Sequence, residues 1–182
     1  YDIAPGNCLI DEWVRKNSKK KFDEKGKIAR TGKVNDLTLN QALDNFDILK
    51  FDKSLDIKDF DISFVKGLSF EDGCSTLTKF TADLICEGIQ NVNKLNNSKP
   101  INNLICGGGR KNEFLIEVIK QNLNKKEIKI ENINQYGFDG DFVESQAFAY
   151  LSIRRILNLP ISFPNTTKCK TPTVGGKINK NF

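Results

Sequence analysis

Three consecutive glycines, Gly107 to Gly109, constrain this fold more than any other feature, because they lie between an apolar run and a helical pattern. The run from Ile101 to Cys106 is typical of a short β-strand. A strand that turns through bare backbone into a helix leaves peptide groups where a phosphate or a ribose can approach closely. A tight connection that binds nothing is an equally good interpretation of the glycines alone.

A second strand pattern, from Ile128 to Ile133, follows a helical pattern at 111–123. Strands that alternate with a helix predict a parallel layer joined by a right-handed crossover. The chain is therefore expected to have an α/β fold. The helix between the strands directs five apolar side chains inward: Phe114, Leu115, Val118, Ile119 and Leu123.

The longest helical pattern covers about 71–94 and follows the capping sequence S-x-x-D, which starts at Ser69. We expect its apolar face to be buried, with six side chains directed inward: Leu77, Phe80, Leu84, Ile85, Ile89 and Val92.

Three shorter helices are predicted at 8–16, 37–46 and 142–157, with Asn7 as the N-cap of the first. The lysine-rich segment between the first two resembles a surface hairpin or an extended loop. We find no internal repeat and no domain boundary, so one globular domain is expected from 182 residues with 38% apolar and 28% charged side chains.

The composition excludes several classes of site. The chain has no histidine, so a bound metal would need oxygen ligands and acid–base chemistry would depend on carboxylates. Its five cysteines form no C-x-x-C pair, which argues against a zinc site or a disulfide framework, and we expect them to be reduced and buried.

The formal charge of +5 comes mainly from lysine runs that favour solvated surface over nucleic-acid binding. No apolar run reaches the roughly 20 residues needed to span a bilayer, and the first residues lack a secretory pattern, so a cytoplasmic location without a membrane partner is expected. The chain has no methionine and begins at Tyr1, which predicts that it is a piece of a longer protein.

Carboxylates at two helix starts are candidate functional groups. Asp2 precedes a Pro-Gly turn that opens the first helix, where it could serve as a base beside a bound anion, or simply be a solvated terminus. Asp141 and Glu144 have the D-x-x-E spacing of a helix cap, although Glu144 could instead face a ligand. Arg110 could contact a phosphate, but a solvent-facing arginine is the commoner case.

Four segments resemble, in the same order, those of the anhydro-N-acetylmuramic acid kinases. YDIAPGNCLIDEWV is similar to their FDTGPGN-x-L-I-D-x-W sequence, and the others are CGGGRKN, DGDFVESQAFAYLSIRR and LPISFPNTT with TPTVGG. Ala4 replaces the usual glycine, Lys168 replaces another, and KFDKSLDIKDFD matches the family's PPKS-x-G-x-E-x-F only in part.

The resemblance implies the C-terminal lobe of a sugar kinase related to actin and the heat-shock ATPases, with a mixed sheet flanked by helices. A phosphate loop, G-x-S-x-D-G, would lie upstream in a separate lobe. The whole chain, 1–182, would form one nucleotide- and sugar-binding lobe, and a homodimer is possible.

The same resemblance assigns roles to seven residues. With ATP and Mg²⁺, such an enzyme opens the anhydro ring of anhydro-N-acetylmuramic acid and phosphorylates O6. Asp2 would be the catalytic base, and Asn7 and Glu144 would bind the sugar. The residues expected beside the adenosine are Gly107, Gly108, Gly109 and Asn112. A non-catalytic nucleotide-binding module is the alternative, and nucleic-acid binding through the lysines is a third, weaker hypothesis.

Overall fold

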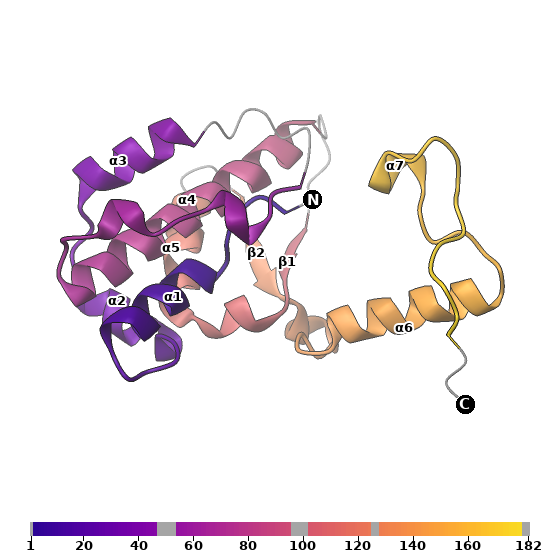
Figure 1. Ribbon diagram of the computed structural model, residues 1–182, viewed down its shortest axis with the longest axis horizontal. Helices are drawn as coiled ribbons and strands as arrows, with labels where there is room; N and C mark the ends of the chain where they lie inside the picture. Colours follow the sequence, from indigo (N-terminus) through magenta and orange to yellow (C-terminus); the bar gives the residue numbers. More distant parts are fainter. Residues whose placement is uncertain (1, 47–53, 96–101, 125–127, 180–182) are drawn as a thin grey trace.

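The structure is a computed structural model that describes residues 2–46, 54–95, 102–124 and 128–179. It has two parts that differ in packing (Figure 1). The body comprises the described residues up to Gly140, and the arm comprises residues 141–179, which extend away from the body.

Helix α4, Phe70–Leu95, is the centre of the body. It packs against helices that precede it in the sequence and against one that follows it. Ser69 Oγ accepts a hydrogen bond from the Asp72 N–H at 3.1 Å, which confirms the predicted capping sequence. Leu77, Phe80 and Leu84 are buried as predicted, whereas Val92 is 47% exposed, so its predicted inward position is wrong. Four helices contact α4: α1 (Cys8–Asn17), α2 (Lys27–Thr31), α3 (Asp36–Asn45) and α5 (Glu113–Asn124).

The apolar interior consists of two clusters along α4. The larger joins one part of α4 to α1, α2 and α3 and includes Leu9, Trp13 and Val65. The smaller joins α4 to α5 and the sheet and includes Leu115 and Ile130. Because α4 contributes to both clusters, its packing holds the glycine-turn side of the body to the α1 side.

The described strands are β1, Asn103–Ile105, and β2, Ile130–Asn132, which pair in parallel with Leu104 opposite Glu131. A 3-10 helix at Gly108–Lys111 and α5 connect them, which confirms the predicted strand, helix, strand order. Among the described residues, the one named sheet is this parallel pair. Antiparallel pairing among them is an isolated bridge between Ser162 and Thr173 in the arm.

The lysine-rich segment is helical in its second half, so the predicted hairpin or extended loop is wrong. A 3-10 helix, Glu24–Gly26, leads directly into α2. Asp23 is buried, and its carboxylate accepts the backbone N–H groups of Ile28 and Ala29 at 2.8 and 2.9 Å. These bonds satisfy helix-start amides and fix the segment against the body.

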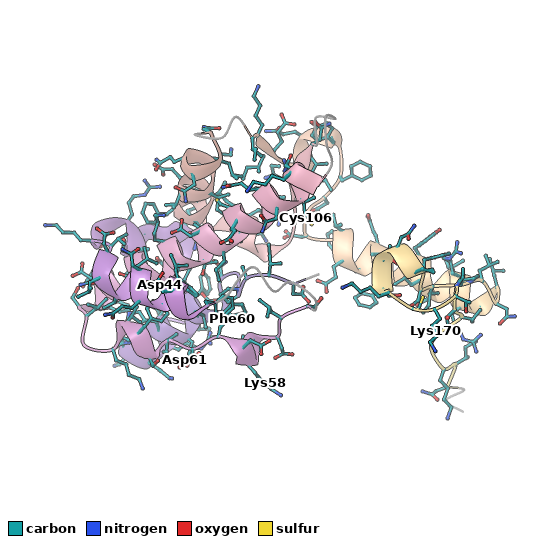
Figure 2. The ribbon with its side chains drawn as sticks, turned by 90° about the horizontal axis from the view of Figure 1, so that it is seen from above. Asp44, Lys58, Phe60, Asp61, Cys106 and Lys170 are labelled. Carbon is teal, nitrogen blue, oxygen red and sulfur yellow. The ribbon has the colours of Figure 1, made fainter. Side chains whose placement is uncertain are left out.

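Two further 3-10 helices, Ile57–Asp59 and Ser63–Val65, cross the body between α3 and α4. Phe60 and Phe64 from this stretch pack against the larger cluster, and the Phe60 ring stacks on Phe46 at 4.9 Å between centroids. Figure 2 shows Phe60 within the body, with Asp44, Lys58 and Asp61 around it. Apolar anchoring of this kind explains why a segment without helical periodicity is nevertheless ordered.

The arm contains α6, Val143–Ile156, and the short α7, Pro164–Thr167. Every residue of α6 is described and none is buried. The arm folds back on itself through the Arg154 guanidinium, which donates to the Pro160 carbonyl at 2.6 Å, and through Arg155, which donates to the Gly176 carbonyl at 2.9 Å. Hydrogen bonds from these two arginines thus join α6 to the segments that follow it.

The cysteines lie in different environments, so the prediction that all are buried is wrong. Cys74 and Cys86 are buried, and burial raises the pKa of their thiols to about 12 and about 11. Cys8 and Cys106 are exposed, and Cys169 in the arm is partly exposed; all five are free thiols. Figure 2 shows Cys106 near the junction of body and arm.

Candidate functional site

A cavity of about 770 Å³ lies where three separate segments of the body meet. The first wall is the start of α1, the second is the stretch that leads into α2, and the third runs from the glycine turn to the start of α5. A cavity of this size is in the usual range for a small-molecule site. Its walls are residues 5–8 with Asp11, residues 22–25, and residues 108–109 with 111–113.

The glycine turn presents bare backbone to this cavity. Gly107 has φ +74°, which favours glycine, and its N–H donates to the Gly140 carbonyl at 2.8 Å. Side chains at Gly108 and Gly109 would meet no atom within 4 Å and would need no left-handed backbone. Neither dihedral angle nor packing explains glycine at those two positions. A ligand that approaches the backbone closely requires that no side chain stands there. The two glycines therefore favour a ligand-binding turn over a tight connection that binds nothing.

Asn112 joins two walls of the cavity. Its side chain is buried, its Nδ2 donates to Asn7 Oδ1 at 3.1 Å, and its Oδ1 accepts the Leu115 N–H at 3.1 Å. Asn112 therefore caps α5 and holds the start of α1 beside it. Asn7 occupies the N-cap position of α1, as predicted, but its side chain makes no capping bond to that helix. Two asparagines so distant in sequence offered no signal of this contact.

Carboxylates outnumber cations on the cavity walls. Lys25 Nζ pairs with Glu113 at 2.8 Å, which raises the pKa of the lysine and lowers that of the glutamate. Burial raises the pKa of Asp11; Arg15 lowers it and Asp23 raises it by smaller amounts. Carboxylates accept hydrogen bonds from hydroxyl and amino groups and repel phosphates. This side of the cavity is therefore suited to the uncharged end of a ligand.

The second wall was missed by the sequence patterns. It includes Phe22, which is 54% exposed and lines the cavity. An exposed aromatic face beside open backbone can stack on a planar ring. A Phe-Asp pair in a lysine-rich stretch carries no distinctive spacing, so only the folded chain reveals it as part of the site.

Asp141 pairs with basic residues of the glycine turn and does not cap α6, contrary to the cap prediction. Phe142 occupies the N-cap position, and no side chain caps the helix. Arg110 Nη1 and Lys111 Nζ donate to the Asp141 carboxylate at 2.6 and 2.8 Å. The hydrogen bond from Arg110, supported by that from Lys111, holds the pKa of Asp141 well below its usual value.

Three predicted site residues do not line the cavity: Gly107, which precedes its wall, and the carboxylates Asp2 and Glu144. Both carboxylate side chains are exposed, and neither has a hydrogen-bond or ion-pair partner among the described residues. The Asp2 backbone is held by Ser54 Oγ, which accepts its N–H at 3.2 Å, and by Leu55, whose N–H donates to its carbonyl at 2.9 Å. The cavity thus unites Asn7, Gly108, Gly109 and Asn112 but leaves the two carboxylates outside.

Within the described ranges, no three Asp, Glu or Cys side chains gather where they could hold a metal ion. The donor set of these residues therefore does not fit a metal centre held by protein ligands alone. No helix among the same residues has the length and apolarity required to cross a bilayer.

Comparison with known proteins identifies the family. The family model described as anhydro-N-acetylmuramic acid kinase matches residues 1–181. Relatives named anhydro-N-acetylmuramic acid kinase include that of Pelagibacter ubique, which is 52% identical over 100% of this chain and 49% of its own length. Those of Zymomonas mobilis and Caulobacter vibrioides are each 36% identical over 98% of this chain and 47% and 46% of their lengths.

The chain thus spans about half the length of the curated relatives it matches. The α/β fold with its small parallel sheet agrees with the predicted kinase fold. The family model matches residues 1–181, almost the whole of this chain, and the relatives named above carry the same description. The chain belongs to the anhydro-N-acetylmuramic acid kinase family.

Proposed function

We propose that this chain forms the nucleotide- and sugar-binding lobe of an ATP-dependent anhydro-N-acetylmuramic acid kinase of cell-wall recycling. The observation that carries the proposal is the cavity in which the start of α1 meets the glycine turn, joined by the bond between Asn112 and Asn7. Those two segments belong to the sequences that resemble the family. Membership of the family, and the names of its relatives, support a kinase that uses ATP.

The adenosine of ATP would occupy the cavity, with its base against Phe22 and its ribose hydroxyls near the carboxylate-rich wall. Gly108 and Gly109 would let the nucleotide approach their backbone, while Gly107 shapes the turn. The phosphates would point away from Asp11 and Glu24, because like charges repel strongly where water is excluded. Asn112 would contribute by holding the two walls together.

The sugar side would use Asp2 as the base, with Glu144 and Asn7 holding the sugar or the attacking water. Water would add its oxygen to the anomeric carbon as the bond from that carbon to O6 breaks, and Asp2 would accept the proton. O6 would then bond to the γ-phosphorus, and ADP would leave. The products are N-acetylmuramic acid 6-phosphate and ADP.

Mg²⁺ is proposed as the companion of ATP because it neutralises charge on the transferred phosphoryl group. Proteins usually hold this ion through substrate phosphates and one or two carboxylates. We derive no step through it from the described residues. A cytoplasmic location and a homodimer belong to the same proposal.

The test is Asp2→Asn in the full-length protein. A coupled ADP assay with the anhydro sugar should show turnover reduced by roughly 10²- to 10⁴-fold, the usual contribution of a general base. ATP affinity, measured by calorimetry, should stay the same because Asp2 lies outside the cavity. Asp36→Asn is the matched control, since Asp36 is an exposed carboxylate at the first turn of α3.

Unchanged turnover of Asp2→Asn would remove Asp2 from the mechanism. Wild-type protein that binds ATP without releasing ADP in response to the sugar would instead be a non-catalytic nucleotide-binding module. Absence of ATP binding would overturn the assignment of the cavity.

A further inference from the structure

Arg110 lies between the glycine turn and the start of the arm, and only 8% of its side chain is exposed. Its Nη1 donates to the Gly107 carbonyl at 2.8 Å and to Asp141 Oδ1 at 2.6 Å. Its Nε donates to Asn134 Oδ1 at 3.2 Å. One planar guanidinium thus contacts three segments at once, which its rigid set of donors allows and a lysine ammonium would not reproduce.

A backbone bond closes the same assembly. The Gly107 N–H donates to the Gly140 carbonyl at 2.8 Å, and the Gly107 carbonyl accepts from Arg110, which also binds Asp141. Gly107 is therefore tied to the segment before α6 both directly and through Arg110. A side chain at Gly140 would lie 2.7 Å from Arg110 Nε, so glycine there lets the guanidinium lie against the backbone. We call these contacts of Arg110, Gly107, Gly140 and Asp141 the Arg110 clasp.

The clasp links two features that the proposed function uses separately. On one side, Gly107 leads directly into Gly108 and Gly109 at the cavity wall. On the other, Asp141 precedes α6, whose first turn carries Glu144. A displacement of the guanidinium would therefore move the nucleotide wall and the Glu144 carboxylate together.

We infer that Arg110 is a positioning residue that couples the glycine turn to the helix bearing Glu144. The inference rests on the proposed function, because it assumes that ATP uses the turn and that Glu144 acts on the sugar or the water. Arg110 touches neither substrate; it acts through Gly107 and Asp141. Its role therefore differs from the phosphate contact considered for it from the sequence.

The experiment is a double-mutant cycle in the full-length kinase with Arg110→Ala and Glu144→Gln. Arg110→Ala should raise the KM for ATP on the order of ten-fold, because small misplacements of positioning groups have effects of this size. Glu144→Gln should lower kcat, and its effect should shrink roughly ten-fold once Arg110 is absent, since the carboxylate is then already misplaced. Asp141→Asn should reproduce the KM effect.

Arg30→Ala is the matched control, because Arg30 makes a comparable ion pair with Glu117 at 2.5 Å outside the cavity. It should leave both parameters unchanged. If Arg110→Ala does not fold, as judged by its melting curve, the cycle is run with Arg110→Lys. Lysine keeps the charge but cannot make all the hydrogen bonds of the Arg110 guanidinium.

If the Arg110 and Glu144 substitutions have additive effects on kcat while the wild type turns over ATP, the inferred coupling is wrong and the proposed function stands. Wild-type protein without sugar-dependent turnover would overturn the proposed function, and the inference with it. A purely structural role of Arg110 would lower the melting temperature but give no coupling to Glu144.

Discussion

Helices α4 and α6 both carry many apolar side chains, yet one is the centre of the body and the other is exposed to solvent. Leu77 and Leu84 of α4 are fully buried, whereas Phe148 and Ile156 of α6 are 62% and 69% exposed. The difference lies in their neighbours, since α4 packs against four helices and the arm stands apart from the body (Figure 1). An apolar stripe stabilises a fold only where another element covers it.

The comparison also separates two ways of holding a helix. Burial of apolar side chains stabilises the position of α4, and apolar contacts do not depend on the relative orientation of the groups. Polar contacts hold the start of α6, through Asp141 and the Gly107 amide, and these specify orientation while burying little area. Several apolar side chains of α6 are exposed, including Phe148 and Ile156. We therefore expect the two regions to respond differently to substitution.

The largest difference is expected from truncation of apolar side chains. In the 182-residue chain, Leu84→Ala should lower the free energy of unfolding by about 2–5 kcal/mol, because it leaves a cavity in the α4 core. Ile153→Ala, at a position 56% exposed, should change it by less than about 0.5 kcal/mol. Urea unfolding followed by circular dichroism measures both. Equal losses would show that the arm is packed as tightly as the body.

Glycine substitutions should show a smaller difference. Gly26 has φ +73°, and an added methyl group would fall on Asn112 and Phe114, so Gly26→Ala should destabilise the chain by about 1–3 kcal/mol. Gly108→Ala should leave stability almost unchanged, because open space surrounds it, but should weaken ATP binding to the full-length protein. Thermal melts and calorimetry separate the outcomes. Unaltered ATP affinity in Gly108→Ala would remove the turn from the site.

The smallest effect is expected from acid. The folded-state pKa of Asp141 is depressed below its ordinary value of 3.8, so its stabilising contribution is present above pH 3.8 and is lost as the pH falls through the folded pKa. The protection factor of the Gly107 amide, which is the exchange rate of an unfolded amide divided by that of Gly107 at the same pH, should stay constant down to about pH 4 and fall only below it. Asp141→Asn should remove this acid dependence. If the Gly107 amide of the wild type is unprotected at near-neutral pH, the contacts of Asp141 and Gly107 do not hold the arm to the body.

Much of the fold was predictable where a sequence pattern is compatible with only one kind of secondary structure. The helices at 8–17, 70–95 and 113–124 and the parallel strands around them follow from apolar spacing and from a glycine turn. Helix α2 was not predictable, because its five residues carry one buried apolar side chain, Ala29, and depend on the buried Asp23 carboxylate. A five-residue helix fixed by the carboxylate of Asp23, just before it, is too short to show a detectable periodicity.

The site was predictable only in part for a related reason. Gly108, Gly109 and Asn112 stand out locally, and the cavity includes them. The wall at Phe22 and the bond between Asn112 and Asn7 join residues far apart in sequence, which no local spacing reports. Asp141 has the spacing of a cap, but its carboxylate pairs with Arg110 and Lys111 of the glycine turn, which lie about thirty residues earlier and carry no local signal.

By itself, the sequence determined the family, the α/β class and the bare turn of Gly107 to Gly109, since these depend on residue identity and short-range spacing. The tertiary structure decided which helix is buried, which segments enclose the cavity, and that Arg110 ties the turn to α6. Burial and long-range hydrogen bonds depend on neighbours brought together by folding, and a linear pattern carries no record of them.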